Sequence, residues 1–93
     1  MKATLITKER VSISDRATVY SLIWKVPHPV IWSAHLYKYS LAFVVDGLCV
    51  LRYDNERGKG DHRHVGMQET SYAFTSPKQL LVDFWAEVRS YME

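Results

Sequence analysis

The sequence has one cysteine, three prolines, four glycines and no long apolar run among its 93 residues. A single cysteine, Cys49, excludes an intrachain disulfide and is typical of a reducing compartment; we expect its side chain to be buried. Without an apolar stretch of about 18 residues or a signal peptide, we expect one cytoplasmic domain over residues 1–93 with no membrane contact. Aromatic residues, at 13% of the chain, supply core area instead, and Trp24, Trp32 and Trp85 are expected in that core.

Positive and negative side chains nearly balance, since the formal net charge is only +2 at pH 7. Dedicated nucleic-acid binders are usually more basic, so the overall charge does not by itself require such a partner. The middle of the chain is nevertheless rich in cations, namely Lys38, Arg52, Arg57, Lys59 and Arg63. A local basic patch is therefore expected there.

Segments rich in β-branched and aromatic residues predict a series of short strands. These are residues 3–7, 17–26, 36–45, 48–53, 62–67 and 72–74. Asp46-Gly47 is the strongest short hairpin signal in the chain. A regular two-residue hairpin places Ser40 opposite Tyr53, so Tyr53 is expected on the same sheet face as Lys38.

The last segment predicts an amphipathic helix. Ser76 is a favourable N-cap, Pro77 suits the first helical position, and Gln79 completes a capping box. Apolar residues follow at helical spacing: Leu80, Leu81, Phe84, Trp85, Val88 and Met92. The predicted fold class is therefore α+β, with an antiparallel sheet of four to six strands in meander-like order and the C-terminal helix packed on one face.

Residues 52–64, with the sequence RYDNERGKGDHRH, form a polar run that a hairpin loop does not need. A polar turn takes two to five residues, so the excess indicates chemistry or a charged partner. Histidine exchanges protons near neutral pH, and cations stabilise charge on a phosphate undergoing cleavage. The catalytic candidates are His62, His64, Arg57 and Tyr53, and the phosphate-binding candidates are Lys38, Arg52, Lys59 and Arg63.

Two other interpretations of this run stay open. The histidines can be ordinary surface residues of a mobile loop. Alternatively, Asp61, His62 and His64 can bind a metal ion, as imidazole and carboxylate ligands do. Neighbouring cations disfavour a divalent ion, so no metal and no cofactor are expected.

The stretch from His35 to Gly47, the polar run 52–64 and the later segment LLVDFW together resemble the TumE-type toxin family of prokaryotic type II toxin–antitoxin modules. The resemblance covers roughly residues 16–90. It implies a small toxin that is neutralised by a cognate helix-turn-helix antitoxin. The catalytic roles given above rest on residue chemistry and not on the resemblance.

The resemblance and the residue chemistry together predict a metal-independent endoribonuclease with RNA, or RNA at the ribosome, as its target. An alternative is a non-catalytic binding module whose 52–64 segment grips a protein or nucleic-acid partner. A metal-dependent enzyme is the third hypothesis, and an oligomer is compatible with each of them.

Overall fold

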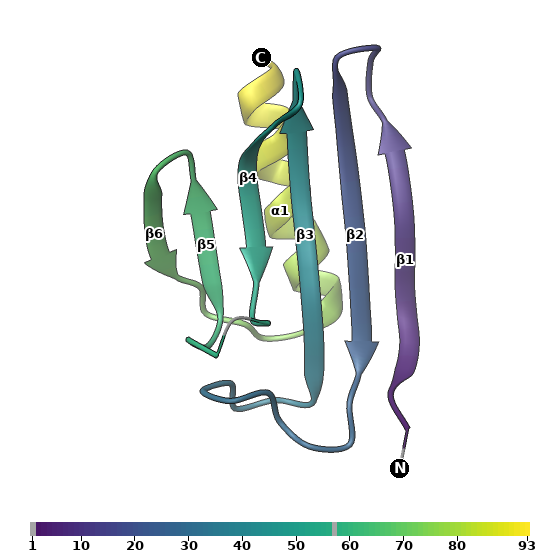
Figure 1. Ribbon diagram of the computed structural model, residues 1–93, viewed down its shortest axis with the longest axis vertical. Helices are drawn as coiled ribbons and strands as arrows, with labels where there is room; N and C mark the ends of the chain where they lie inside the picture. Colours follow the sequence, from purple (N-terminus) through teal and green to yellow (C-terminus); the bar gives the residue numbers. More distant parts are fainter. Residues whose placement is uncertain (1, 57) are drawn as a thin grey trace.

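The computed structural model describes residues 2–56 and 58–93. It contains a single six-stranded sheet and one helix (Figure 1). The strands are β1 (Thr4–Ser12), β2 (Ala17–Lys25), β3 (Tyr37–Val45), β4 (Leu48–Asp54), β5 (His62–Val65) and β6 (Gln68–Ser71), and the helix is α1 (Pro77–Met92). The strands lie in sequence order and each pairs antiparallel with the next. The sheet is therefore a meander, and the predicted α+β class is confirmed.

Helix α1 begins where the sequence predicts. The Ser76 side chain accepts a hydrogen bond from the Gln79 backbone N–H at 3.0 Å, and Pro77 occupies the first turn. The Gln79 side chain donates to Asp83 instead of closing the capping box. The helix lies behind β3 and β4 in Figure 1, so one face of the sheet is covered there and the opposite face is free.

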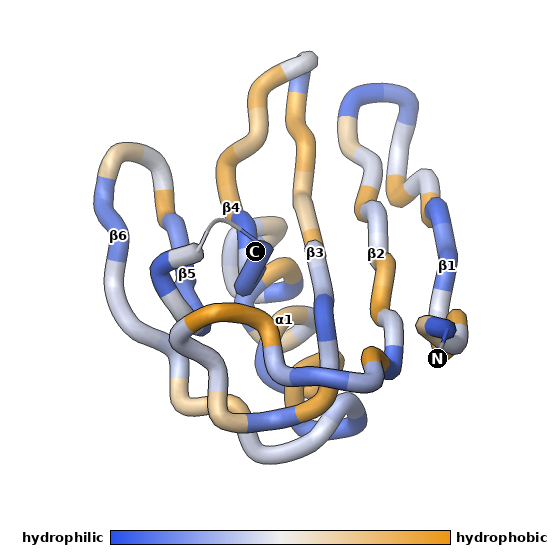
Figure 2. Tube along the Cα trace, turned by 60° about the horizontal axis from the view of Figure 1, so that its bottom comes forward, coloured by the Kyte–Doolittle hydropathy of each residue, from blue (hydrophilic) through white to orange (hydrophobic). Residues whose placement is uncertain are grey.

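The core lies between α1 and the central strands. Its fully buried members come from β2, β3, β4 and α1, and they include Val19, Ile23, Leu41, Phe43, Leu80, Phe84 and Val88. Figure 2 shows the same division: apolar residues are frequent along β2, β3 and β4, whereas β5 is mainly hydrophilic. Burial of apolar area stabilises this centre, and the polar outer strands are left to present side chains to solvent.

The predicted hairpin register is wrong beyond its turn. Asp46 and Gly47 both have positive φ, as a type I′ hairpin turn requires. A bulge follows between Phe43 and Val44, so Ser40 pairs with Asp54, and Leu41 pairs with Tyr53. A one-residue shift moves every later side chain to the other sheet face. Tyr53 therefore lies on the buried face, away from Lys38.

Three smaller predictions are also wrong. Cys49 is exposed, because the bulge leaves it near the hairpin end outside the core. Trp32 is 80% exposed, because it lies in the loop between β2 and β3. The last strand is Gln68–Ser71 and not residues 72–74, which leave the sheet toward α1. Trp85 does pack against the core. The prediction for Trp24 is a fourth that is wrong, because Trp24 follows buried Ile23 on β2 and lies half-buried on the opposite sheet face.

Candidate functional site

The pairing of β4 with β5 divides the predicted site residues between the two sheet faces. Arg52 lies opposite His64, and Tyr53 lies opposite Arg63. Successive residues of a strand point to opposite faces. Because the Tyr53 side belongs to the core, His64 and Arg52 point to the face that α1 leaves uncovered, which we call the open face.

On the helix face, Tyr53 and Arg63 are held by Glu87 of α1. The Arg63 Nη2 atom lies 2.5 Å from Glu87 Oε2, and both the Arg63 Nε–H and the Tyr53 hydroxyl donate to the other oxygen. The Arg63 hydrogen bonds lower the pKa of the Glu87 carboxyl. Burial raises the pKa of the Tyr53 phenol, and its bond to Glu87 raises it further. These contacts anchor α1 to the sheet.

On the open face, Arg52 and His64 line a hollow of about 250 Å³ together with Cys49, Leu51 and Gly66. Pockets that enclose small molecules measure about 300–1,000 Å³. This hollow is smaller and open, which suits contact with one group of a larger molecule. The Arg52 side chain is 32% exposed and its guanidinium lies 3.9 Å from Asp54.

His62 accompanies His64 because residues two apart on a strand share a face. Their ring centroids lie 6.2 Å apart. In His62, Nδ1 lies 2.8 Å from the Gly60 carbonyl oxygen, to which it donates, and Nε2 lies 3.2 Å from Glu69 Oε1. The other oxygen of Glu69 lies 4.0 Å from His64 Nδ1. Glu69 is therefore within hydrogen-bonding distance of His62 and makes a longer electrostatic contact with His64.

Two lysines lie in the same region, Lys59 beside Glu69 and Lys38 on β3, two strands from His62. Lys59 Nζ lies 3.6 Å from Glu69 Oε1, and Lys38 Nζ lies 4.0 Å from Glu56 Oε2. Both ammonium groups are substantially exposed, so their ion pairs contribute little to stability. Both remain available to phosphate groups.

The open face extends beyond the polar run to residues that sequence reasoning did not select. One cross-strand row crosses all six strands, through Arg10, Tyr20, Ala42, Arg52, His64 and Glu69. The Arg10 guanidinium lies over the exposed Tyr20 ring, 5.9 Å from its centroid. Alternation in β1 and β2 was the only sequence signal for this pair, and it becomes informative only once the register is known.

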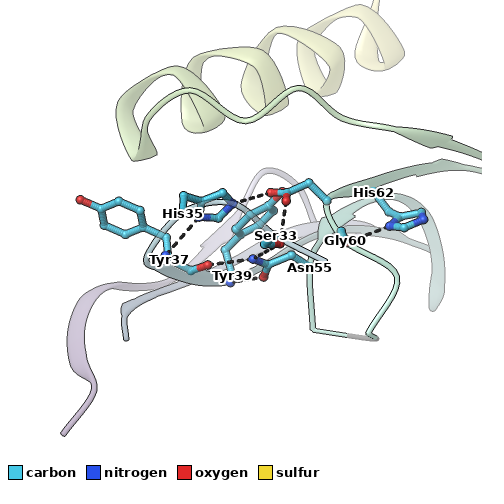
Figure 3. A network of polar contacts seen from close by, with 8 residues as sticks. Ser33, His35, Tyr37, Tyr39, Asn55, Gly60 and His62 are labelled. Atoms are coloured by element: carbon cyan, nitrogen blue, oxygen red, sulfur yellow. Dashed lines mark hydrogen bonds and ion pairs between the residues drawn. The ribbon is translucent and has the colours of Figure 1, made fainter. Parts of the chain in front are cut away.

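A second polar network lies at the end of the sheet and is drawn in Figure 3. The Asp61 carboxylate accepts hydrogen bonds from the Ser33 hydroxyl at 2.7 Å, His35 Nε2 at 2.7 Å and the Tyr39 hydroxyl at 2.6 Å. Burial and the bond to Asp61 raise the pKa of the Tyr39 phenol. Buried Asn55 adds bonds to the β3 backbone and to Ser33.

This network is structural. His35 Nδ1 accepts from the Tyr37 backbone N–H, so both ring nitrogens of His35 are already engaged. The His35 ring also stacks on Phe74, with centroids 3.8 Å apart. The network therefore joins the 26–36 loop to residues 55–61, which carry the chain toward His62. In the chain outside positions 1 and 57, no group of three or more His, Cys, Asp or Glu side chains is arranged to hold a metal ion.

Of the predicted residues, the structure brings His62, His64, Arg52, Lys38 and Lys59 together on or beside the open face. It separates Tyr53 and Arg63, which bind Glu87 on the other face. The catalytic candidate Arg57 lies outside the described residues.

The fold and the site define a small α+β protein whose sheet has one face covered by the helix and one open face, on which His62, His64 and Arg52 lie. A family model described as Toxin TumE matches residues 2–92. The chain therefore belongs to the TumE toxin family, whose members are toxins of toxin–antitoxin modules, and an antitoxin is the partner that this membership implies. No curated protein and no solved structure matches the chain. In residues 2–56 and 58–93, no helix is long and apolar enough to cross a membrane.

Proposed function

We propose that this toxin cleaves RNA in the cytoplasm, without a metal ion, on the open face of its sheet. In the reaction a base removes the proton of a ribose 2′-hydroxyl and the freed oxygen attacks the adjacent phosphorus. The bond from phosphorus to the 5′-oxygen breaks, and an acid protonates that oxygen. The observation that carries the proposal is the common position of His62, His64 and Arg52 on one uncovered face.

The two histidines have the spacing that this reaction needs. The attacking and leaving oxygens lie on opposite sides of the phosphorus, and each must be within about 3 Å of its proton acceptor or donor. Rings whose centroids lie 6.2 Å apart can reach one oxygen each. In His62 the Nδ1 atom is engaged by Gly60, so Nε2 is the nitrogen that exchanges a proton, and the substrate displaces Glu69, which lies 3.2 Å from Nε2 at a part-exposed position.

Arg52 supplies the positive charge. Its guanidinium donates up to five hydrogen bonds in a planar fork that fits phosphate oxygens, and it lies directly across the ladder from His64. Arg63 is a poorer candidate because Glu87 already binds it through two bonds. Tyr53 is also left out of the proposal, because it is only 2% exposed and its hydroxyl donates to the same carboxylate.

The surroundings support a polymeric substrate. Lys59 shares Glu69 with His62, and Lys38 lies two strands away on β3, so both can bind phosphates that flank the cleaved one. Tyr20 and Arg10 continue the same row toward the β1 edge. An aromatic ring beside cations is a frequent arrangement for single-stranded RNA.

The test is cleavage of labelled single-stranded RNA by the purified protein in excess EDTA, with and without ribosomes. The products should carry 2′,3′-cyclic phosphate and 5′-hydroxyl ends. Replacing both His62 and His64 by Ala should lower the rate by about 10²–10⁴ or more. His28→Ala, at an exposed histidine between two prolines, is the matched control and should keep full activity, whereas residual activity of the double variant reports contaminating nuclease. Full growth arrest on induction of the double variant would contradict the proposal.

One observation favours a second candidate, a non-catalytic binding module. Glu69 lies within 4.0 Å of cationic or ionisable groups on Lys59, His62 and His64, so the face carries both signs of charge, as protein partners prefer. This function predicts stoichiometric binding without cleavage and only a shallow dependence on salt, whereas phosphate binding weakens steeply with salt.

We further propose that the antitoxin is a helix-turn-helix protein. A small reading frame of that kind beside the toxin gene supports this, and rescue of growth by co-expression of its product tests it. An antitoxin of another class that restores growth would exclude it.

A further inference from the structure

Trp32 is unusual in both exposure and backbone conformation. Its side chain is 80% exposed, although tryptophan is among the largest apolar residues. Its φ is +70°, in the left-handed region that non-glycine residues rarely adopt. In the chain outside positions 1 and 57, the only other such residue is Asp46, which its hairpin turn requires. A strained residue of this kind is a recognised indication of function.

The surrounding contacts hold Trp32 in this conformation. The Ser33 backbone N–H donates to the Val30 carbonyl at 2.9 Å, which closes a turn around Trp32. The Ser33 hydroxyl is bonded to Asp61. The Trp32 carbonyl packs so closely on Gly60 that a Cβ there would lie 2.8 Å from its oxygen. The indole is therefore presented to solvent from a fixed backbone.

A hollow of about 330 Å³ lies beside Trp32 at the end of the sheet. Its lining includes Trp32, His35, Lys59, Gly60, Tyr72 and Phe74. Lys59 also pairs with Glu69 Oε1, the atom that faces His62 Nε2. Lys59 is thus the residue that the hollow shares with the surroundings of His62.

We propose that Trp32 is a stacking platform for one unpaired base of the RNA, adjacent to the nucleotide whose phosphate is cleaved. The base lies on the indole over the hollow, and Lys59 binds the phosphate that joins this nucleotide to the next. Only an unpaired base offers its face to a side chain, so the site selects single strands. This inference rests on the proposed function, because it assumes RNA at His62 and His64.

The experiment measures binding apart from cleavage. The probe is a short oligouridylate with methylated 2′-oxygens, which cannot be cleaved, and its partner is an abasic oligomer of the same length and charge. Wild-type protein should bind the base-bearing oligomer about tenfold or more tightly than the abasic one. Trp32→Ala should remove that preference and leave affinity for the abasic oligomer unchanged. Ile31→Ala, an exposed neighbour in the same loop, should retain the preference.

A second readout uses fluorescence. A protein carrying Trp24→Phe and Trp85→Phe has Trp32 as its remaining tryptophan, and its emission should be quenched by the base-bearing oligomer alone. The proposal is overturned if Trp32→Ala keeps the preference, if the emission does not respond, or if wild-type protein binds neither oligomer. If wild-type protein prefers the base-bearing oligomer but does not cleave ordinary RNA, the proposed nuclease function is overturned and the stacking platform is supported.

Discussion

Arg52 of β4 and His64 of β5 lie directly opposite each other on the open face, and the next pair along the same ladder, Tyr53 and Arg63, lies on the helix face. Two arginines of one polar run therefore have different surroundings. One faces solvent beside two histidines, and the other is bound by Glu87.

The two arginines should respond differently to the same substitution. We expect Arg52→Gln to lower RNA cleavage by about 10²-fold or more, because it removes a donor to the developing charge, with little change in Tm. Arg63→Gln should instead lower Tm by several degrees, since it removes a contact between sheet and helix, and should keep its activity while folded. Thermal unfolding and initial cleavage rates measure both effects. Equal loss of activity in both variants would contradict this division.

The contact between Arg63 and Glu87 should also appear in the pH dependence of stability. Arg63 lowers the pKa of the folded Glu87 carboxyl below its usual value. The folded state then binds this proton less tightly than the unfolded state, so the contribution to stability is complete above the usual carboxyl pKa. It is lost as the pH falls through the lowered value. Urea unfolding between pH 7 and acid pH should therefore show a flatter curve for Glu87→Gln than for wild type.

Glu9→Gln on exposed β1 is the matched control, because it makes the same chemical change at a carboxylate that does not contact Arg63. Its curve should run parallel to that of the wild type. A Glu87→Gln curve parallel to the wild type would show that the ion pair does not contribute to folding.

Most of this fold could be predicted from signals in neighbouring residues. The features that depend on contacts between distant residues could not. The Asp46-Gly47 turn and the Ser76 cap depend on neighbouring residues alone, and both are as predicted. The bulge beyond Phe43 arises because the pairing that buries Leu51 and Tyr53 against α1 stabilises the core. That preference depends on a helix more than twenty residues away and leaves no local pattern.

The candidate site was predicted in part for the same reason. Alternation along β5 puts His62 and His64 on one face, and this follows from their spacing of two residues once the segment is a strand. The shift at the bulge decided that Arg52, and not Tyr53, joins them. Trp32 was missed because its exposure follows from a loop whose shape is set by Asp61 and Gly60, both distant in sequence.

Gly60 should be the least replaceable glycine of the polar run. Its φ is +85°, and a Cβ would lie 2.8 Å from the Trp32 carbonyl oxygen. Gly58 has a similar φ of +71° but nothing within 4 Å of its Cβ position. In urea unfolding, Gly58→Ala should therefore lower the free energy of unfolding by only the cost of a Cβ at positive φ, about 1–2 kcal/mol. Gly60→Ala should lower it by clearly more, because its Cβ also collides with the Trp32 carbonyl. Equal losses of unfolding free energy in the two variants would mean that the loop backbone moves away from the added Cβ at no energetic cost.

The Asp61 network should contribute more than any one of its bonds. Asp61→Asn keeps the shape but offers one acceptor oxygen, so its amide N–H₂ faces donors on Ser33, His35 or Tyr39. We expect a loss of about 2 kcal/mol or more, because a part-buried donor is left unpaired. Ser33→Ala removes the donor to Asp61 and one acceptor for the Asn55 amide, which keeps its bond to the Tyr37 carbonyl, so it should cost only about 1 kcal/mol. Urea unfolding of both variants tests the order, and a larger loss for Ser33→Ala would contradict it.

The strain at Trp32 predicts a variant that is more stable and less functional. Glycine adopts φ of +70° without a Cβ penalty of about 1–2 kcal/mol, although it loses more backbone entropy on folding. Since the indole is mostly exposed, Trp32→Gly gives up few contacts. We expect it to stabilise the protein by about 0.5–1 kcal/mol, whereas Trp32→Ala keeps its Cβ and gains nothing.

Both variants should bind the base-bearing oligouridylate about tenfold or more weakly, because both lack the ring. Urea unfolding and oligomer binding on the same preparations separate the two quantities. If the strained backbone is retained for the aromatic surface, Trp32→Gly should gain stability and lose binding. Trp32→Ala should lose binding without a gain in stability. If Trp32→Gly is less stable than Trp32→Ala, the conformation carries no such strain and the exposed ring needs another explanation.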